Sequence, residues 1–263
     1  MHPARLLPGT GDRYDLMTTI ASVAILSDMH GNSAATEAVL ADIDIHHPGE
    51  VICLGDLVGY GARPNETIDL IRSRKIPTIM GNYDDGVGFD RDDCGCAYRD
   101  AAERERGQQS LMWSRVVVTD DRKAWLRSLV PELRREVNGV RIRLVHGSPR
   151  RMNEYLFEDR DPASLARIAR SADCDVLVFG HTHIPWSLTI EGVRFVNTGS
   201  VGKPKDGDPR AGWVLLTVDE AGRVVSETQR VAYDIASMAA AIREANGLPD
   251  HYAHDIETGG QAG

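Results

Sequence analysis

The sequence has no excess of basic charge and no long apolar run. Its 30 lysine and arginine residues are outnumbered by 39 aspartate and glutamate residues, which gives a formal net charge of -9 at pH 7. Stable binding of nucleic acid or of an anionic membrane needs a basic surface, so neither partner is expected. No stretch approaches the roughly 20 apolar residues of a membrane span. A small phosphorylated substrate remains compatible with an acidic chain, because a bound metal ion can dominate the local charge.

Cysteine is also scarce, and no secretory signal is visible. The four cysteines are Cys53, Cys94, Cys96 and Cys174. Residues 1–17 lack the continuous apolar segment of a signal peptide, so we expect a cytoplasmic protein in a reducing environment. The same segment carries no hydrophobic period and is expected to be a disordered tail, with Met17 as a candidate natural start.

Internal repeats and interdomain linkers are missing as well, which favours one domain. Short unbroken apolar runs at 22–27, 51–54 and 77–80 alternate with segments of helical spacing that begin near Asn32 and Pro64. Strands of this kind are typical of a parallel sheet whose two faces are both covered.

Strands dominate the second half of the chain. Further strands are expected at 141–145, 176–179, 187–190, 193–196, 212–218 and 223–231. A last amphipathic helix covers 235–242. We therefore expect a single α/β domain over residues 18–250, with two stacked mixed sheets flanked by helices. A polar inserted loop is expected at 83–110 and a flexible tail at 251–263.

Polar side chains with metal-binding chemistry follow five of the apolar runs. They are Asp28, His30, Asp56, Asn82, His146, His181 and His183. In α/β sheets the loops beyond the carboxyl ends of parallel strands gather into one crevice, where ligands bind. Any one of the acidic or amide residues also fits an ordinary turn. Four histidines at such positions do not, because turns have no special use for imidazole.

Imidazole and carboxylate without thiolate suit a divalent ion such as Mn, Fe, Ni or Zn. Seven ligands are more than one tetrahedral ion needs. They fit two ions that share a carboxylate, the arrangement used for attack on phosphorus. We expect two divalent metal ions as cofactors, with Mn²⁺ favoured.

The motifs that carry these residues resemble the calcineurin-like metallophosphoesterase superfamily, in particular its small bacterial and archaeal phosphodiesterase-type members. They are SDMHGN at 27–32, LGDLVGYG at 54–61, GNYD at 81–84, VHGS at 145–148, GHTH at 180–183 and NTGSVG at 197–202. The resemblance implies a four-layer α/β/β/α fold. It also implies in-line hydrolysis of a phosphate ester by a hydroxide that bridges two metals.

The resemblance assigns each ligand a place. Asp28, His30 and His183 would bind the first metal, and Asn82, His146 and His181 the second. Asp56 would bridge the two. Asn197 and Ser200 would support the site without being ligands.

The resemblance also suggests residues for catalysis and phosphate binding. The candidate catalytic residues are Asp56, Asn82, Tyr83, Asp84 and His146. The candidate phosphate-binding residues are Asn82, Tyr83, His146 and Arg63. Many relatives have histidine where this chain has Tyr83, and a phenol with a reference pKa near 10 is a weak general acid at neutral pH. Tyr83 could instead contact a phosphate oxygen, stack on a base, or pack under the 83–110 loop.

Other interpretations of the sequence stay open. Cys94-Gly95-Cys96 could add a soft ligand or a redox brake, but it also fits a tight loop of small residues. The chain could be a phosphomonoesterase of the protein-phosphatase type, with Arg63 as a phosphate clamp. It could also be a non-catalytic scaffold of the same fold, although scaffolds are expected to have lost ligands. The natural substrate, with a nucleotide-like molecule as one option, and the oligomeric state are not visible in the sequence.

Overall fold

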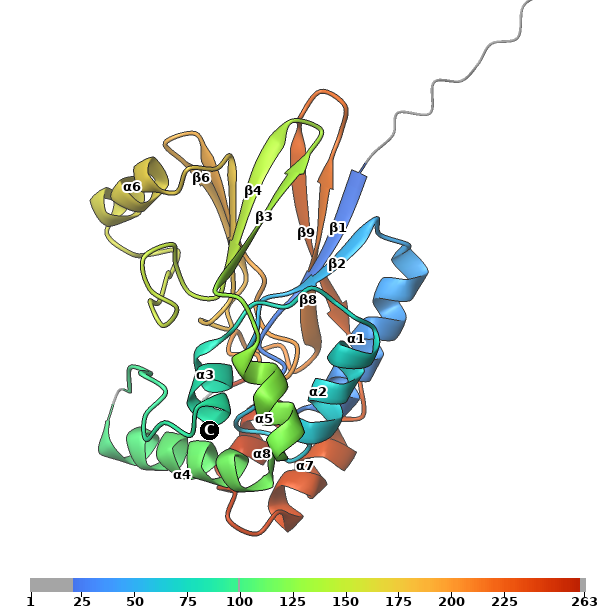
Figure 1. Cartoon of the computed structure of the whole chain (residues 1–263), viewed down its shortest axis with the longest axis vertical. Helices are drawn as coiled ribbons and strands as arrows, with labels where there is room; N and C mark the ends of the chain where they lie inside the picture. Colours follow the sequence, from blue (N-terminus) through green and yellow to red (C-terminus); the bar gives the residue numbers. More distant parts are fainter. Residues whose placement is uncertain (1–20, 99, 261–263) are drawn as a thin grey trace, which may run out of the picture.

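Two β-sheets lie face to face at the centre of the molecule (Figure 1). The computed structural model describes residues 21–98 and 100–260, so the expected tail at 1–17 lies outside the described residues. The first sheet has the strand order β2-β1-β8-β9. Its strands are β1 (Ala21–Leu26), β2 (Glu50–Cys53), β8 (Ala211–Val218) and β9 (Val224–Val231). β1 is parallel to β2 and antiparallel to β8, so the sheet is mixed as expected.

The second sheet has the strand order β3-β4-β5-β7-β6. Its strands are β3 (Glu132–Val137), β4 (Val140–Val145), β5 (Val176–Phe179), β6 (Trp186–Ile190) and β7 (Val193–Asn197). β4, β5 and β7 run parallel to one another, while β3 and β6 pair antiparallel at the edges. The carboxyl ends of the parallel strands therefore open toward one end of the molecule.

Apolar side chains from both sheets form the core between them. Ile25 and Val214 of the first sheet belong to the same buried cluster as Val178 and Val196 of the second. β-Branched residues pack well on such pleated surfaces, and each one buried contributes about 1.5–3 kcal/mol. The unbroken apolar runs in the sequence reflect strands that are covered on both faces.

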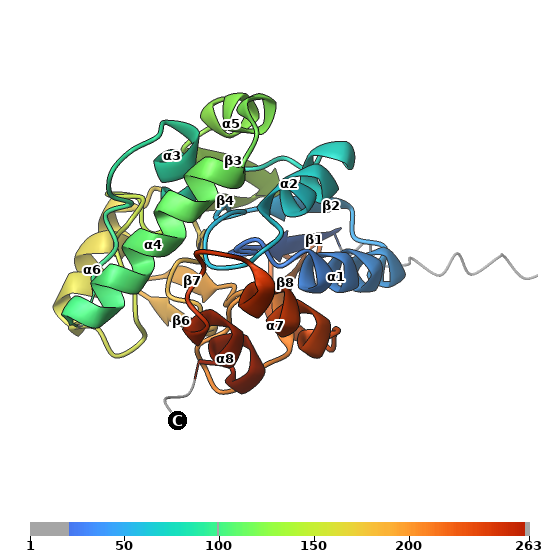
Figure 2. The same cartoon turned by 90° about the horizontal axis from the view of Figure 1, so that it is seen from below.

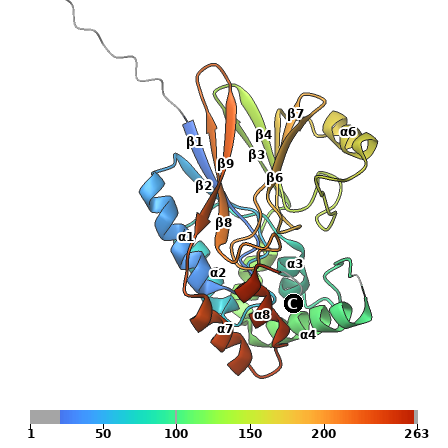
Figure 3. The same cartoon turned by 180° about the vertical axis from the view of Figure 1, so that it is seen from behind.

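Helices cover the outer faces of both sheets, which completes the four layers (Figures 1 and 3). α1 (Ser33–His46) and α2 (Pro64–Ser73) share a core with β1. α7 (Ile235–Glu244) lies beside α1. On the other side, α6 (Pro162–Ser171) packs Leu165 and Ile168 against β5 and β7. The sequence pattern did not predict this helix. The expected α/β/β/α arrangement is confirmed.

The segment 83–110 is helical for much of its length and is not the loop that was expected. It contains α3 (Asn82–Gly88) and most of α4 (Ala101–Val117), which α5 (Asp120–Arg127) follows. α4 buries a stripe of small or polar residues, Gly107, Ser110 and Ser114, with Leu111 as its one large apolar side chain. This composition has no apolar period, which explains why the sequence pattern did not predict a helix.

The C-terminal segment also differs from the expectation of a flexible tail. Residues His251–Thr258 form α8, which ends at Gly259 in the left-handed conformation (φ 67). Tyr252 and Ile256 of α8 are buried with Met238 of α7. Seen from below, α8 and α4 lie on opposite sides of the strand ends (Figure 2).

The expected strand at 77–80 is reduced to two isolated bridges. Thr78 pairs with Cys53 of β2, and Ile79 pairs with Val130 just before β3. The segment thus lies between the two sheets at the end where the parallel strands open. No helix in the described ranges is both long and apolar enough to cross a membrane.

Candidate metal centre

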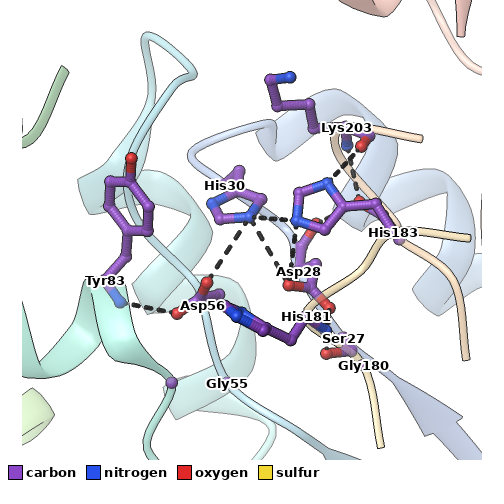
Figure 4. A network of polar contacts seen from close by, with 12 residues as sticks. Ser27, Asp28, His30, Gly55, Asp56, Tyr83, Gly180, His181, His183 and Lys203 are labelled. Carbon is purple, nitrogen blue, oxygen red and sulfur yellow. Dashed lines mark hydrogen bonds and ion pairs between the residues drawn. The ribbon is translucent and has the colours of Figure 1, made fainter. Parts of the chain in front are cut away.

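The loops that leave the strands bring all seven predicted ligands into one buried cluster. β1 leads to Asp28 and His30, and β2 leads to Asp56. β4 leads to His146, β5 leads to His181 and His183, and the 77–80 segment leads to Asn82. All seven side chains are buried. Figure 4 shows several of them pointing toward a common centre.

The first group of potential ligands consists of Asp28, His30 and His183, whose ligand atoms lie within 4.8 Å of one another. The Nε2 atom of His183 is 3.0 Å from Nε2 of His30 and 3.2 Å from Oδ1 of Asp28. Asp28 Oδ1 has no hydrogen-bond partner within the described part of the chain, although it is buried. An orphaned carboxylate oxygen beside two imidazole nitrogens fits a divalent cation.

The second group consists of Asp56, His146 and His181. The Nε2 atom of His146 is 3.3 Å from Oδ2 of Asp56 and 3.1 Å from Oδ1 of Asn82. His181 Nε2 is buried and, among the residues described, has no hydrogen-bond partner. This group therefore presents a second set of nitrogen and oxygen donors suited to a cation.

Asp56 lies between the two groups. Its Oδ2 atom is 3.3 Å from His146 of the second group and 3.7 Å from His30 of the first. Its other oxygen, Oδ1, accepts a hydrogen bond from the backbone N–H of Tyr83 at 2.8 Å. One carboxylate oxygen is thus held by the backbone while the other faces both groups.

Backbone carbonyl oxygens orient three of the four imidazoles. The Nδ1 atoms of His30, His146 and His183 lie 2.6–2.9 Å from the carbonyl oxygens of Val58, Leu54 and Lys203. A histidine that donates through Nδ1 presents Nε2 as the ligand atom, which is the usual outer-shell arrangement of metal sites. Lys203 was not identified from the sequence, because any residue type can supply a carbonyl.

Three of the histidines have shifted pKa values, and the shifts differ in direction. Burial lowers the pKa of His181 and His183 to about 3, so both are neutral ligands at pH 7. Burial also opposes a charge on His146, but the negative charge of Asp56 outweighs it and raises the pKa to about 10. Burial alone would raise the pKa of Asp28, yet contacts with His183 and His30 hold it well below its usual range.

Five of the seven predicted ligands adopt the left-handed backbone conformation, which residues other than glycine rarely take. Their φ values are 57 for Asp28, 48 for His30, 55 for Asp56, 66 for His181 and 62 for His183. Each costs on the order of 1 kcal/mol or more, and such strain concentrates at functional sites. Backbone hydrogen bonds between the loops, including Asp28 N to Gly55 O and His30 N to Asp56 O, offset this cost.

The amide of Asn82 is oriented by the Cys94-Gly95-Cys96 segment. Its Nδ2 donates to the carbonyl oxygen of Cys94 at 3.2 Å and to Sγ of Cys96 at 3.1 Å. The Oδ1 atom is consequently directed toward His146. The two sulfur atoms are 2.9 Å apart as free thiols. The cysteine pair therefore contacts the centre through Asn82.

Asp84 and Tyr83 support Asp56 in different ways. The Asp84 carboxylate accepts the backbone N–H groups of Asp56, Leu57 and Gly81 at 2.7–3.0 Å. The Tyr83 ring is buried, lies edge-on to His30 at 5.4 Å and fills the space beside Gly59. Its hydroxyl is enclosed, with no hydrogen-bond partner among the described residues. The catalytic and phosphate-binding roles of Tyr83 stay predictions.

The remaining predicted residues lie around the centre. The Asn197 amide donates to Gly180 O and Thr182 Oγ1, and the Ser200 hydroxyl donates to Asp28 O. Arg63 precedes α2 and is half-buried. In the part of the chain that the structure describes, its guanidinium has no hydrogen bond or ion pair. Its role as a phosphate clamp stays a prediction.

Two known proteins are similar to this chain over most of its length. An uncharacterized protein of Methanocaldococcus jannaschii is 32% identical over 233 residues, which cover 81% of this chain and 88% of that protein. Phosphodiesterase YfcE of Escherichia coli is 24% identical over 220 residues, covering 80% of this chain and 95% of that protein.

Solved structures share the fold. A metallophosphoesterase from Sphaerobacter thermophilus superposes with a TM-score of 0.71 at 29% identity, covering 92% of this chain and all of that one. A hypothetical protein from Pyrococcus horikoshii has the same fold, with a TM-score of 0.78 at 22% identity over 92% of this chain and all of that one. Residues 22–221 match the family model of the calcineurin-like phosphoesterase superfamily domain. This match spans most of the sequence, so the chain belongs to the calcineurin-like phosphoesterase superfamily.

Proposed function

We propose that the protein is a phosphodiesterase that uses two divalent metal ions to hydrolyse a small phosphorylated substrate. The observation that carries the proposal is the position of Asp56, with Oδ2 3.3 Å from His146 and 3.7 Å from His30. One carboxylate shared by two donor groups is the arrangement of dinuclear hydrolytic sites. The name of the Escherichia coli relative, a phosphodiesterase, supports a diester as the substrate.

Each group of side chains would hold one ion. Asp28, His30 and His183 would hold the first, while His146, His181 and Asn82 would hold the second, with Asp56 between them. When bound, two such ions supply a hydroxide nucleophile near neutral pH for in-line attack and stabilise negative charge on the phosphate oxygens. Mn²⁺ is the ion we favour, with Fe, Ni and Zn as the alternatives that these ligands accept.

The protein itself would orient the metal ligands and exclude water from around them. Carbonyl oxygens fix the ring orientation of His30, His146 and His183, so their Nε2 atoms need no reorganisation. The Asp84 carboxylate holds the backbone at Asp56 and Leu57 and the turn at Gly81. The ligands are buried, which strengthens their electrostatic effect on a phosphate.

The experiment compares hydrolysis of bis(p-nitrophenyl) phosphate and p-nitrophenyl phosphate by metal-depleted protein with and without Mn²⁺. We expect Mn²⁺ to restore diester hydrolysis and EDTA to abolish it. Asp56→Asn should lower kcat at least 100-fold, because the shared carboxylate loses its charge. His254→Gln, a histidine on the exposed side of α8, is the matched control and should retain wild-type activity.

The outcomes separate the proposal from its rivals. Faster hydrolysis of the monoester than of the diester would favour a phosphomonoesterase. Bound metal without hydrolysis of either ester, with Mn, Fe, Ni or Zn, would favour a non-catalytic scaffold. Wild-type activity in Asp56→Asn would contradict the shared-carboxylate arrangement.

A further inference from the structure

A cavity of about 310 Å³ lies beside the metal centre. Among its lining residues are Tyr60, Cys96, Tyr155, Thr182 and Lys203. Each of these five contacts or adjoins a predicted metal ligand. Cavities of this size are typical of small-molecule sites. A substrate whose phosphate lies at the metals would therefore extend into this space.

Two ring contacts and one neighbour in the chain show how closely the cavity adjoins the centre. The Tyr155 ring lies 4.1 Å from the His181 ring, and the Tyr60 ring lies 4.7 Å from the His30 ring, measured between centroids. Thr182 stands between His181 and His183 in the chain. The cavity and the metal ligands thus share their walls.

Aromatic side chains are concentrated in this cavity. The chain has 4 Phe, 4 Trp and 7 Tyr in total. Five of them line the cavity: Tyr60, Tyr98, Tyr155, Phe157 and Tyr252. Flat apolar walls with polar edges favour a planar aromatic group, because stacking uses the ring faces while the hydroxyls reach polar atoms.

The cavity is also lined by basic side chains, which give it positive charge. Lys203 is neutralised by Asp255, with Nζ 2.6 Å from Oδ2, and it lies over the Tyr60 and Tyr252 rings. Lys205 and Arg106 also line the cavity, and neither forms an ion pair within the described ranges. Glu103 and Asp255 are the two acidic lining residues, so the three basic residues leave the cavity with excess positive charge.

Lys205 lies next to the candidate metal centre. Its backbone N–H donates to the carbonyl oxygen of His183 at 3.2 Å, so the residue directly adjoins a ligand of the first group. Arg106 comes from α4 and Lys205 from the loop that precedes β8. Cations from two separate elements can hold an anionic group that lies beyond the phosphate at the metals.

We propose that the cavity recognises a nucleotide that carries a second phosphate group, with the base against the tyrosines and that phosphate at Lys205 and Arg106. This substrate class rests on the proposed function, in which a different phosphate is hydrolysed at the metals. The excess cations distinguish it from a neutral aryl ester, which would use only the aromatic walls.

The test uses two chromogenic diesters that differ by one group. They are the p-nitrophenyl ester of thymidine 5′-monophosphate and the same ester with an added 3′-phosphate. With Mn²⁺ we expect kcat/KM at least 10-fold higher for the 3′-phosphorylated ester, mainly through a lower KM. Lys205→Met should reduce this ratio at least 5-fold, and Arg106→Met should act in the same direction. Lys75→Met, outside this cavity, is the matched control and should preserve the ratio.

Binding of thymidine 3′,5′-bisphosphate by calorimetry gives a readout that needs no turnover. We expect Lys205→Met to weaken this binding at least 5-fold relative to Lys75→Met. Hydrolysis of both esters with equal kcat/KM, and equal binding by the two variants, would overturn the inference while the phosphodiesterase stands. Binding that depends on Lys205 without hydrolysis would support the inference and overturn the proposed reaction. Absence of both binding and hydrolysis would overturn both.

Discussion

Gly81 shows at the scale of one residue how closely the chain encloses Asp56. Its φ of -91 is ordinary for any residue, so conformational freedom does not require glycine there. Space does, because a Cβ atom at this position would lie 2.1 Å from Asp56 Oδ1 and 2.4 Å from Asp56 N. A side chain at position 81 must displace the carboxylate that faces both donor groups.

Gly81→Ala is therefore expected to impair metal binding more than folding. We expect Mn²⁺ affinity to fall at least 10-fold by titration calorimetry and the free energy of unfolding to fall by about 1–3 kcal/mol. Gly139→Ala is the control, because Gly139 has a φ of 78 but no atom within 4 Å of the added Cβ. It should lower stability and leave Mn²⁺ affinity unchanged. Equal Mn²⁺ affinity in the two variants would contradict the close packing around Asp56.

His146 makes metal binding dependent on pH. The negative charge of Asp56 outweighs the effect of burial and raises its pKa from 6.5 to about 10 in the metal-free protein. The imidazole thus carries a proton at pH 7 that a cation must displace. Mn²⁺ affinity should rise about tenfold per pH unit between pH 6 and 8, since one proton is released. Calorimetry in buffers of different ionisation enthalpy counts that proton, and zero release would contradict this protonation state.

The sequence predicted which polar residues cluster at the candidate metal centre better than it predicted what surrounds them. His146, His181 and His183 follow apolar strands, where an imidazole has few other uses because turns do not favour histidine. The contacts of Tyr83 could not be predicted, because its burial beside Gly59 and Tyr60 depends on how the loops pack. Lys205 and Arg106 belong to no motif, and only the folded chain brings both to the wall of one cavity.

At the scale of elements, α8 forms one wall of the cavity. It is fixed to the body by a buried ion pair, with Lys203 Nζ 2.6 Å from Asp255 Oδ2. The Gly207 N–H also donates to Gly259 O at the end of the helix. A short polar segment near a chain end resembles a tail in sequence, and only these tertiary contacts make it an ordered helix.

Removal of one partner of this pair leaves the other charge buried. Asp255→Ala should lower the free energy of unfolding by about 3 kcal/mol, measured by urea denaturation. Glu257→Ala on the same helix breaks an exposed pair with Arg243 and should cost much less. Similar losses for both variants would contradict a larger contribution of the buried Lys203–Asp255 pair than of the exposed one.

At the scale of the whole molecule, the loops that carry the predicted ligands lie together at one end of the two sheets, next to several of the helices (Figure 1). Strands such as β1, β5 and β8 were predictable because they are mostly buried and nearly continuously apolar, whereas the charged strand β3 (ELRREV) was not predicted. The helices α4, α6 and α8 were not predicted; α4 buries mainly small residues, and α8 has only 8 residues. The apolar core was therefore enough to predict the fold. The shape of the cavity was not predictable, because it depends on α4 and α8, which the sequence pattern did not predict.

We propose that seven residues hold two divalent cations around Asp56. The most direct test is anomalous diffraction at the manganese edge from crystals grown with Mn²⁺. We predict two peaks about 3.5–4 Å apart, one beside Asp28, His30 and His183 and the other beside Asn82, His146 and His181. Absence of peaks at these residues, or one peak that does not contact Asp56, would contradict the account.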